Sequence, residues 1–235
     1  MIKIENADVF GFKAAIRGMR NPMNSWDKSD SGYKPVVVPP VNDIEIKYVI
    51  GENDLKLMRN LGKAGAVHGK YLRMINVTVD ITAPLYWWKE FDTYKVGTVA
   101  NSCSTMHKIH AKEFTLDDFS HEHLFDDEYR GKCMIYPFRA DGYYGGWESR
   151  YILELTIEML NRARELYLET KDKKYWWQMI QLLPSSYNQK RTVQMNYEVL
   201  RGMYEYRKAH KLDEWVEFCK WIETLPYFKE VLLDE

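Results

Sequence analysis

Alternation of apolar and polar residues predicts the strands of this chain. Residues 43–51 (DIEIKYVIG) alternate regularly, and so do residues 70–82 (KYLRMINVTVDIT), whose second half is rich in β-branched side chains. The opening segment also predicts a short strand. Residues 16–40 contain four prolines among Ser, Asp and Gly, which indicates a stretch that is mostly loop.

Apolar residues at helical spacing predict about six helices, concentrated in the last third of the chain. Residues 97–147, which include two acidic blocks and a Gly-Tyr-rich stretch, are expected to be irregular. We therefore predict one α/β domain over residues 1–235, in which segment 1–42 is the least defined. The helical segments are 52–65, 83–94, 151–171, 174–184, 192–210 and 212–225.

Composition narrows the class of protein. The chain has 235 residues, a formal net charge of −1, 46% apolar and 29% charged residues, which is typical of a globular protein. The near-neutral charge gives no general electrostatic reason to bind nucleic acid or an anionic membrane. No apolar run is long enough for a membrane span, and the first residues lack a signal peptide's apolar core. With three widely spaced cysteines, we expect a cytoplasmic protein without a disulfide framework.

Histidines and cysteines are the first candidates for chemistry. His107, His110, His121 and His123 lie close together in sequence near several carboxylates, but their spacing matches no known zinc motif, so we predict no metal site. Cys103 lies between two serines and is a candidate nucleophile, although a buried, unreactive thiol is the simpler interpretation.

Phosphate-binding motifs of the glycine-rich types are absent. Basic residues on the late helices offer another way to bind a phosphate, and a solvated helix face that favours cations near its end is the alternative. These residues are Arg201, Arg207, Lys208 and Lys211.

A continuous block from His68 to Met106 adds a more specific signal. His68 is followed by the strand NVTVDIT, the aromatic segment LYWWKEF and then TYKVGTVANSCSTM. This order resembles the flavin-dependent thymidylate synthases (thymidylate synthase complementing proteins), in which a helix leads into an R-H-R-x-x-S-x-N-E-x-S-x-R-Y signature. Here Thr93, Tyr94 and Lys95 occupy the Arg-His-Arg positions, and Asn101 occupies the Glu position.

A second block lies downstream in the order that the family shows. Leu183-Pro184 precedes Asn196, which stands at the Asn of the family's N-x-R motif, and Glu198 stands where that motif has Arg. Arg207 occupies the position of a later family arginine. Together the two blocks cover roughly residues 43–220.

The resemblance implies an α/β fold with a twisted antiparallel or mixed sheet, a helical C-terminal third and assembly into a homotetramer. It implies methylation of dUMP to dTMP with a folate methylene and a hydride relayed from NADPH through FAD. By position, the residues expected to hold FAD are His68, Tyr94, Lys95, Asn101 and Asn196. Those expected to face the nucleotide are Ser102, Cys103, Ser104 and Arg207.

Three interpretations stay open at this point. The chain is a flavin-dependent synthase or a diverged flavoenzyme, a non-catalytic nucleotide- or flavin-binding module of the same fold, or an unrelated helical protein. The loss of the paired arginines favours the second over full activity, because a lysine cannot reproduce the forked contacts of arginine. The aromatic residues of LYWWKEF and KYWWQM further predict an oligomer interface.

Overall fold

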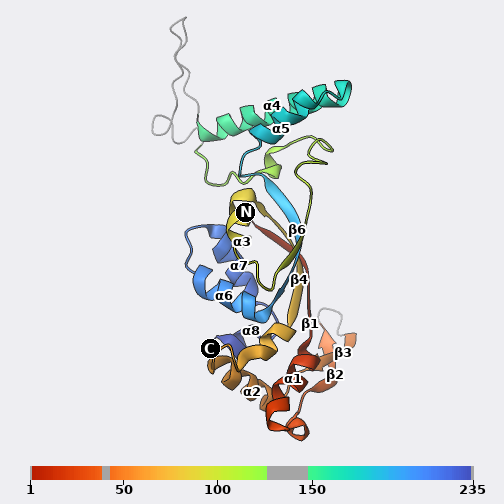
Figure 1. Cartoon of the computed structure of the whole chain (residues 1–235), viewed down its shortest axis with the longest axis vertical. Coiled ribbons are helices and arrows are strands. Elements are labelled where there is room, and N and C mark those ends of the chain that lie inside the picture. Colours follow the sequence, from red (N-terminus) through yellow and green to blue (C-terminus); the bar gives the residue numbers. More distant parts are fainter. Residues whose placement is uncertain (1, 39–42, 126–147, 234–235) are drawn as a thin grey trace, which may run out of the picture. The chain divides into compact units, whose positions relative to one another are not determined.

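The computed structural model describes residues 2–38, 43–125 and 148–233. A four-stranded sheet has the order β1-β4-β6-β5, formed by Lys3–Phe10, Asn76–Pro84, Asn188–Asn196 and Val99–Ser102. The segment NVTVDIT lies in β4, where Val77, Val79, Ile81 and Ala83 alternate into a buried face. The predicted α/β class and the position of this strand in a sheet are confirmed (Figure 1).

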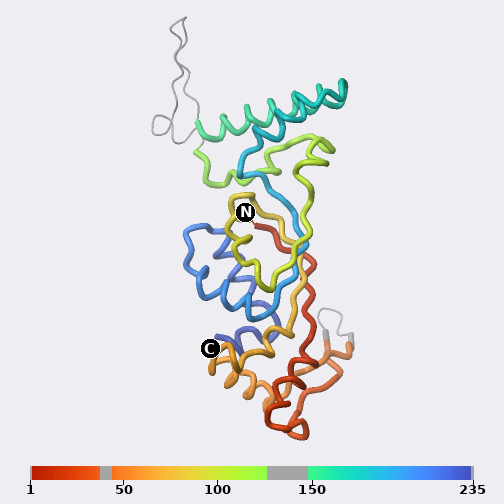
Figure 2. The backbone as a smooth tube through the Cα atoms, in the orientation of Figure 1, coloured from red at the N-terminus to blue at the C-terminus, as the bar shows by residue number. Residues whose placement is uncertain are grey.

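The chain folds into two compact units, and each unit is built from segments that are not continuous in sequence. One unit comprises residues 82–90 and 102–191, and the other comprises 2–81, 91–101 and 192–235, so β4 and β6 contribute to both. Figure 2 shows the course of the backbone through these segments, coloured from red at the N-terminus to blue at the C-terminus. The prediction of one domain over residues 1–235 stays a prediction.

The first unit is organised by a pair of helices, α4 (Ser149–Thr170) and α5 (Lys173–Leu182), which lie side by side. Lys171 turns the chain with a φ of 58°, and Asp172 caps α5 by accepting a hydrogen bond from the Lys174 N–H at 3.0 Å. A core that includes Leu160, Met179 and Phe119 holds the pair against the loop segment before it. The 3-10 turn η4 (Leu116–Asp118) lies in that segment.

The second unit contains the C-terminal helices α6 (Tyr197–Arg207), α7 (Asp213–Glu223) and α8 (Phe228–Leu232). Phe91, Trp215 and Phe218 pack ring against ring in its core. Its other elements are α1 (Phe12–Arg20), α2 (Glu52–Lys63), the 3-10 helix η3 (Gly69–Met74) and the antiparallel hairpin of β2 (Gly32–Val38) and β3 (Asp43–Val49).

Two sequence predictions about this part of the chain were wrong. Residues 16–40 are not mostly loop, because α1 extends to Arg20 and β2 begins at Gly32. Ala15, Ile16 and Met19 form a buried face on α1, and burial outweighed the turn-forming residues around them. The strand predicted over residues 70–82 is a strand only from Asn76, since η3 occupies the residues before it.

The helix predicted over residues 192–210 begins only at Tyr197. Residues Asn188–Asn196 form β6, in which Val193 and Met195 are buried and their neighbours are not. That two-residue period was present in TVQMNY and indicated a strand. The helical C-terminal third is otherwise confirmed, and α8 is an addition to it. Between residues 97 and 125, the predicted irregular stretch holds only the short elements β5 and η4.

Candidate functional site

The turn that follows α3 (Leu85–Phe91) is built around Gly97. Gly97 has a φ of +80°, and a Cβ placed there would lie 2.9 Å from Cγ2 of Val199 and 3.0 Å from Nδ2 of Asn196. The Thr98 hydroxyl closes the turn by donating a hydrogen bond to the Tyr94 carbonyl. The missing side chain at residue 97 therefore lets the turn pack closely on the start of α6.

Asn196, one of the predicted flavin-binding residues, has a structural task at the start of α6. Its Oδ1 accepts a hydrogen bond from the Val199 N–H at 3.0 Å, which makes it the helix N-cap. Its amide nitrogen faces Gly97 of the turn. The side chain thereby joins the turn of residues 94–98 to α6.

Arg207, the last residue of α6, lies against two aromatic side chains. Its Nε donates a hydrogen bond to the Tyr94 hydroxyl at 3.0 Å. The central guanidinium carbon lies 4.9 Å from the centroid of the Trp215 ring and 5.7 Å from that of Tyr94. Trp215 is buried and Arg207 is half-buried. Cation–π contacts and one hydrogen bond thus fix the direction of the guanidinium group.

The structure therefore brings two predicted site residues, Tyr94 and Arg207, into direct contact. Lys95 follows Tyr94 in the same turn and is exposed. Trp215, which sequence reasoning missed, completes this group, and we call Tyr94, Arg207 and Trp215 the arginine cradle. The sequence predicted a helix over residues 212–225, which includes Trp215, but nothing in its pattern indicated that this ring meets an arginine.

The predicted nucleotide-facing residues Ser102, Cys103 and Ser104 belong to the other unit, at the end of the exposed strand β5. The backbone of Cys103 is held by β6: its N–H donates to the Lys190 carbonyl at 2.9 Å, and its carbonyl accepts from Nε2 of Gln189 at 2.7 Å. The Cys103 side chain is exposed, as is that of Asn101 within β5.

Ser104 uses its hydroxyl to stabilise its own turn. Its Oγ accepts hydrogen bonds from the N–H groups of Met106 at 3.3 Å and His107 at 2.9 Å. Such a bond is the usual way in which a serine organises a loop. The hydroxyl-rich composition of this stretch is therefore explained in part by local backbone geometry.

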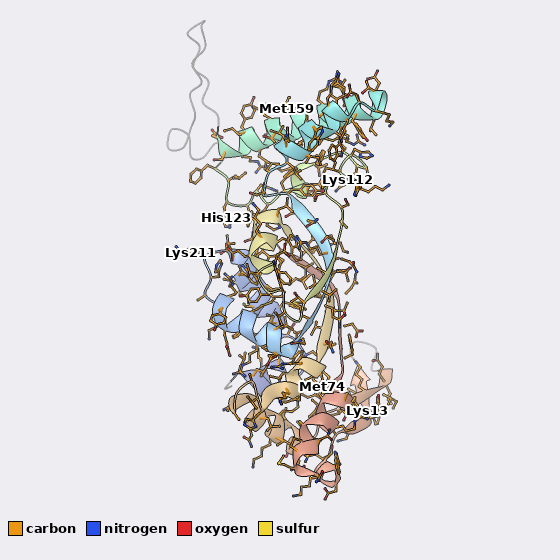
Figure 3. All side chains as sticks on the ribbon, viewed as in Figure 1. Lys13, Met74, Lys112, His123, Met159 and Lys211 are labelled. Atoms are coloured by element: carbon orange, nitrogen blue, oxygen red, sulfur yellow. The ribbon has the colours of Figure 1, made fainter. Side chains whose placement is uncertain are left out.

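His68 lies at a cavity in the second unit. The cavity has a volume of about 490 Å³, and its lining also includes Met19, Lys70, Tyr71 and Met74. None of the arginine cradle residues lines it. Figure 3 labels Met74, which lies on η3 together with Tyr71.

The cysteines and histidines offer little further chemistry. Burial raises the pKa of the Cys219 thiol to about 12, so this cysteine is a neutral core residue at physiological pH. Cys133 lies outside the described residues. Across residues 2–38, 43–125 and 148–233, no three His, Cys, Asp or Glu side chains gather as a metal site would require. His110 packs against the ring of Tyr167, with 4.9 Å between the centroids.

Solved structures of known proteins share this fold. Thymidylate synthase X from Helicobacter pylori, crystallised with FAD and dUMP, matches with a TM-score of 0.64 at 15% identity, over 100% of this chain and 98% of that one. The UMP/dUMP methylase PolB from Streptomyces cacaoi, bound to 5-Br dUMP, matches with a TM-score of 0.55 at 16% identity, over 95% of this chain and 89% of that one. The chain therefore has the fold of the flavin-dependent thymidylate synthases. The resemblance expected from sequence is confirmed at the level of the fold.

Comparison by sequence finds no such likeness, since no family model and no curated protein matches the chain. Within the described residues, no helix is long and apolar enough to cross a membrane.

The residues expected to hold a flavin do not fit that group within one described chain. Asn196 uses its amide oxygen to cap α6, and the Tyr94 hydroxyl accepts a hydrogen bond from Arg207. In residues 93–105, Lys95 is the only cation, whereas the pyrophosphate of FAD carries two negative charges. His68 lines a cavity to which none of the other four residues contributes.

Proposed function

We propose that this protein binds a uridine nucleotide and that Arg207 anchors the phosphate of that ligand. The observation that carries the proposal is the arginine cradle, in which the guanidinium direction is set by Tyr94 and Trp215. Two proteins with this fold were crystallised with uridine nucleotides, dUMP in one case and 5-Br dUMP in the other.

The cradle favours binding because it reduces the conformational freedom that Arg207 would lose to a ligand. An arginine side chain that is already oriented loses less entropy when it forms charge-assisted hydrogen bonds. Guanidinium has five N–H donors, and the Nε–H of Arg207 is directed at the Tyr94 hydroxyl. Bidentate contact with a phosphate is the geometry for which arginine is best suited.

The reaction that we propose is methylation of dUMP to dTMP, with a folate methylene and reducing equivalents from NADPH. A flavin would supply the relayed hydride in such a reaction, and holding it would need residues beyond the five expected from the sequence, because those five do not gather at one site within the described chain. For this chain we assign to Arg207 the anchoring of the nucleotide and to Tyr94 the positioning of Arg207. Cys103, Ser102 and Ser104 stay proposed contacts of the nucleotide.

A second candidate function is favoured by the composition of residues 93–105. With Lys95 as the one cation of that segment, the arginines that the family uses there are replaced by Thr93 and Lys95. Each charged hydrogen bond contributes about 1.5–3 kcal/mol, so their loss weakens an anionic cofactor's binding strongly. The alternative is a nucleotide-binding module without synthase activity.

Calorimetry on the purified protein tests the nucleotide site. We expect dUMP to bind the wild type, and Arg207→Ala to lower the affinity at least about tenfold, which corresponds to about 1.4 kcal/mol. The matched control is Lys208→Ala, which removes an exposed cation from the next position. Equal dUMP affinity in the wild type and Arg207→Ala would remove Arg207 from the site.

An absorption spectrum and an activity assay separate the two candidate functions. A bound flavin that is released as FAD on denaturation, together with dTMP formation from dUMP, supports the enzyme. Nucleotide binding in a protein that stays colourless with added FAD and forms no dTMP supports the module.

We also propose that the protein acts in the cytoplasm as a homo-oligomer, with a tetramer as the expected form. Trp87 and Trp88 are buried within the chain itself, whereas Trp177 of α5 is 41% exposed and is a candidate interface residue. Light scattering at micromolar concentration tests the assembly, since a 28.0 kDa particle would contradict it.

A further inference from the structure

A second cavity lies beside α1 in the second unit, and the side chains that line it differ from those at the His68 cavity. Its volume is about 200 Å³. Basic, aromatic and hydroxyl side chains dominate its lining. They are Lys13, Arg17, Arg20, Trp26, Ser29 and Tyr48.

Three cations line this cavity because they recur along one face of α1. Lys13, Arg17 and Arg20 are spaced i, i+4 and i+7, so they follow one another along the helix. Arg20 is buried, and its charge is offset by Asp54. Lys13, labelled in Figure 3, and Arg17 are exposed, and no carboxylate among the described residues pairs with either. The cavity therefore has a net positive lining that attracts an anion.

Trp26 gives the cavity a flat aromatic wall. Its side chain is 53% exposed, although its indole Nε1–H donates a hydrogen bond to Oδ1 of Asn21 at 2.8 Å. A large apolar ring that is held by its polar edge and open to solvent is a suitable platform for stacking another ring. Lys13 lies 5.5 Å from the centroid of the nearby Tyr33 ring.

The loop that carries Trp26 and Ser29 is fixed from behind by Arg20 and Asp54. Nη1 of Arg20 donates to the Ser25 carbonyl at 3.1 Å, and the Ser29 hydroxyl donates to Oδ2 of Asp54 at 2.6 Å. Because these bonds join groups of the chain itself, they hold the wall of the cavity in place. Preorganisation of this kind lowers the entropy that binding costs.

We propose that this cavity binds a phosphorylated aromatic compound of the size of a nucleoside monophosphate. Lys13 and Arg17 take the phosphate, the ring stacks on Trp26, and the hydroxyls of Ser29 and Tyr48 lie beside them. The small volume, below the range of about 300–1,000 Å³ that holds drug-sized ligands, favours one ring with one phosphate over a dinucleotide. This site is separate from the arginine cradle and does not depend on its role.

Calorimetry with AMP on the Arg207→Ala protein tests this proposal, because that background removes the nucleotide anchor proposed above. We expect AMP to bind, and adenosine and inorganic phosphate each to bind at least about tenfold more weakly. Arg17→Gln and Trp26→Leu should each lower the AMP affinity about tenfold, since one removes a charged donor and the other the stacking surface.

The matched control is Lys34→Gln, which removes an exposed cation of β2 that does not line the cavity, and it should leave AMP affinity unchanged. Thermal melting confirms that each variant is folded. Absence of AMP binding at millimolar concentration would overturn the proposal. So would AMP affinity that is the same in Arg17→Gln, Trp26→Leu and the parent protein.

Discussion

Arg20 and Arg207 end two helices of the same unit, and their surroundings differ in kind. Arg20 is 4% exposed, and its Nε donates to Oδ1 of Asp54 at 2.6 Å. Arg207 is half-buried, and its Nε donates to the Tyr94 hydroxyl at 3.0 Å while its guanidinium group lies over the Trp215 ring. A carboxylate offsets the charge of the first arginine, whereas aromatic groups orient the second. The first arginine is buried and serves the fold, whereas the second is partly exposed to solvent at the end of its helix.

Asp54 shows how completely the first arrangement is satisfied. The carboxylate accepts five hydrogen bonds, from the side chains of Arg20, Ser29 and Ser31 and from the backbone N–H groups of Asp30 and Ser31. Burial acts to raise the pKa of Asp54, but the hydrogen bonds from Ser29, Ser31 and Arg20 outweigh it, and the pKa is lowered. The ionised form is therefore the one that the fold selects.

Asp54→Asn should give the largest effect. The amide leaves the buried charge of Arg20 uncompensated, and breaking a buried pair in this way costs about 3–5 kcal/mol of unfolding free energy. Urea denaturation at pH 7 measures the loss. The control Lys220→Gln breaks an exposed pair with Glu217 and should cost no more than about 1 kcal/mol. Similar losses for the two variants would show that the Arg20–Asp54 pair is not structural.

The same pair sets a dependence of stability on pH. Because the folded pKa of Asp54 lies below its unfolded value of about 3.9, its contribution is fully present above that value and is lost as pH falls through the folded pKa. The wild type should lose more stability than Asp54→Asn on acidification below about pH 4. Parallel stability curves for the two proteins in that range would contradict the assignment.

Sequence patterns predicted much of the fold because burial leaves a period that can be seen in the residues. The alternation in NVTVDIT and the apolar faces of α4, α5 and α7 predicted these elements correctly. Residues 192–196 were assigned to a helix because the helical pattern of α6 begins immediately after them. The N-cap Asn196 marks that boundary, and a capping residue is a more local signal than the apolar period.

The candidate site could be predicted only in part, because its contacts join residues far apart in sequence. The family resemblance singled out Tyr94 and Arg207, but their hydrogen bond spans 113 positions, and no spacing rule reports such a pair. For the same reason, no sequence pattern indicated the contact of Trp215 with Arg207 or the cavity beside α1. The resemblance implied that Ser104 faces a nucleotide, and the structure adds a local role that the sequence did not indicate, because the Ser104 hydroxyl accepts a hydrogen bond from the His107 N–H.

Gly97→Ala tests the turn that presents Tyr94 to Arg207. The added Cβ would lie 2.9 Å from Cγ2 of Val199 in a backbone conformation with a φ of +80°, so we expect a loss of about 1–3 kcal/mol. Gly202→Ala is the matched control: its Cβ meets nothing within 4 Å, and alanine in a helix interior should stabilise by about 0.5–1 kcal/mol. Thermal unfolding of both variants should show opposite shifts. Shifts of the same sign would mean that the turn accepts a side chain.

Tyr94→Phe should give the smallest effect on stability and a clear effect on binding. It removes one hydrogen bond to Arg207 and keeps the ring, so unfolding free energy should fall by about 0.5–1.5 kcal/mol. Affinity for dUMP should fall severalfold, because Arg207 would lose the contact that sets the direction of Nε. In a double-mutant cycle with Arg207→Lys, the two substitutions should be non-additive for dUMP binding, since they act on the same contact. Additive losses would show that Tyr94 does not act through Arg207. The hydrogen bond between Tyr94 and Arg207 would then hold the turn against α6 without orienting the arginine for a ligand.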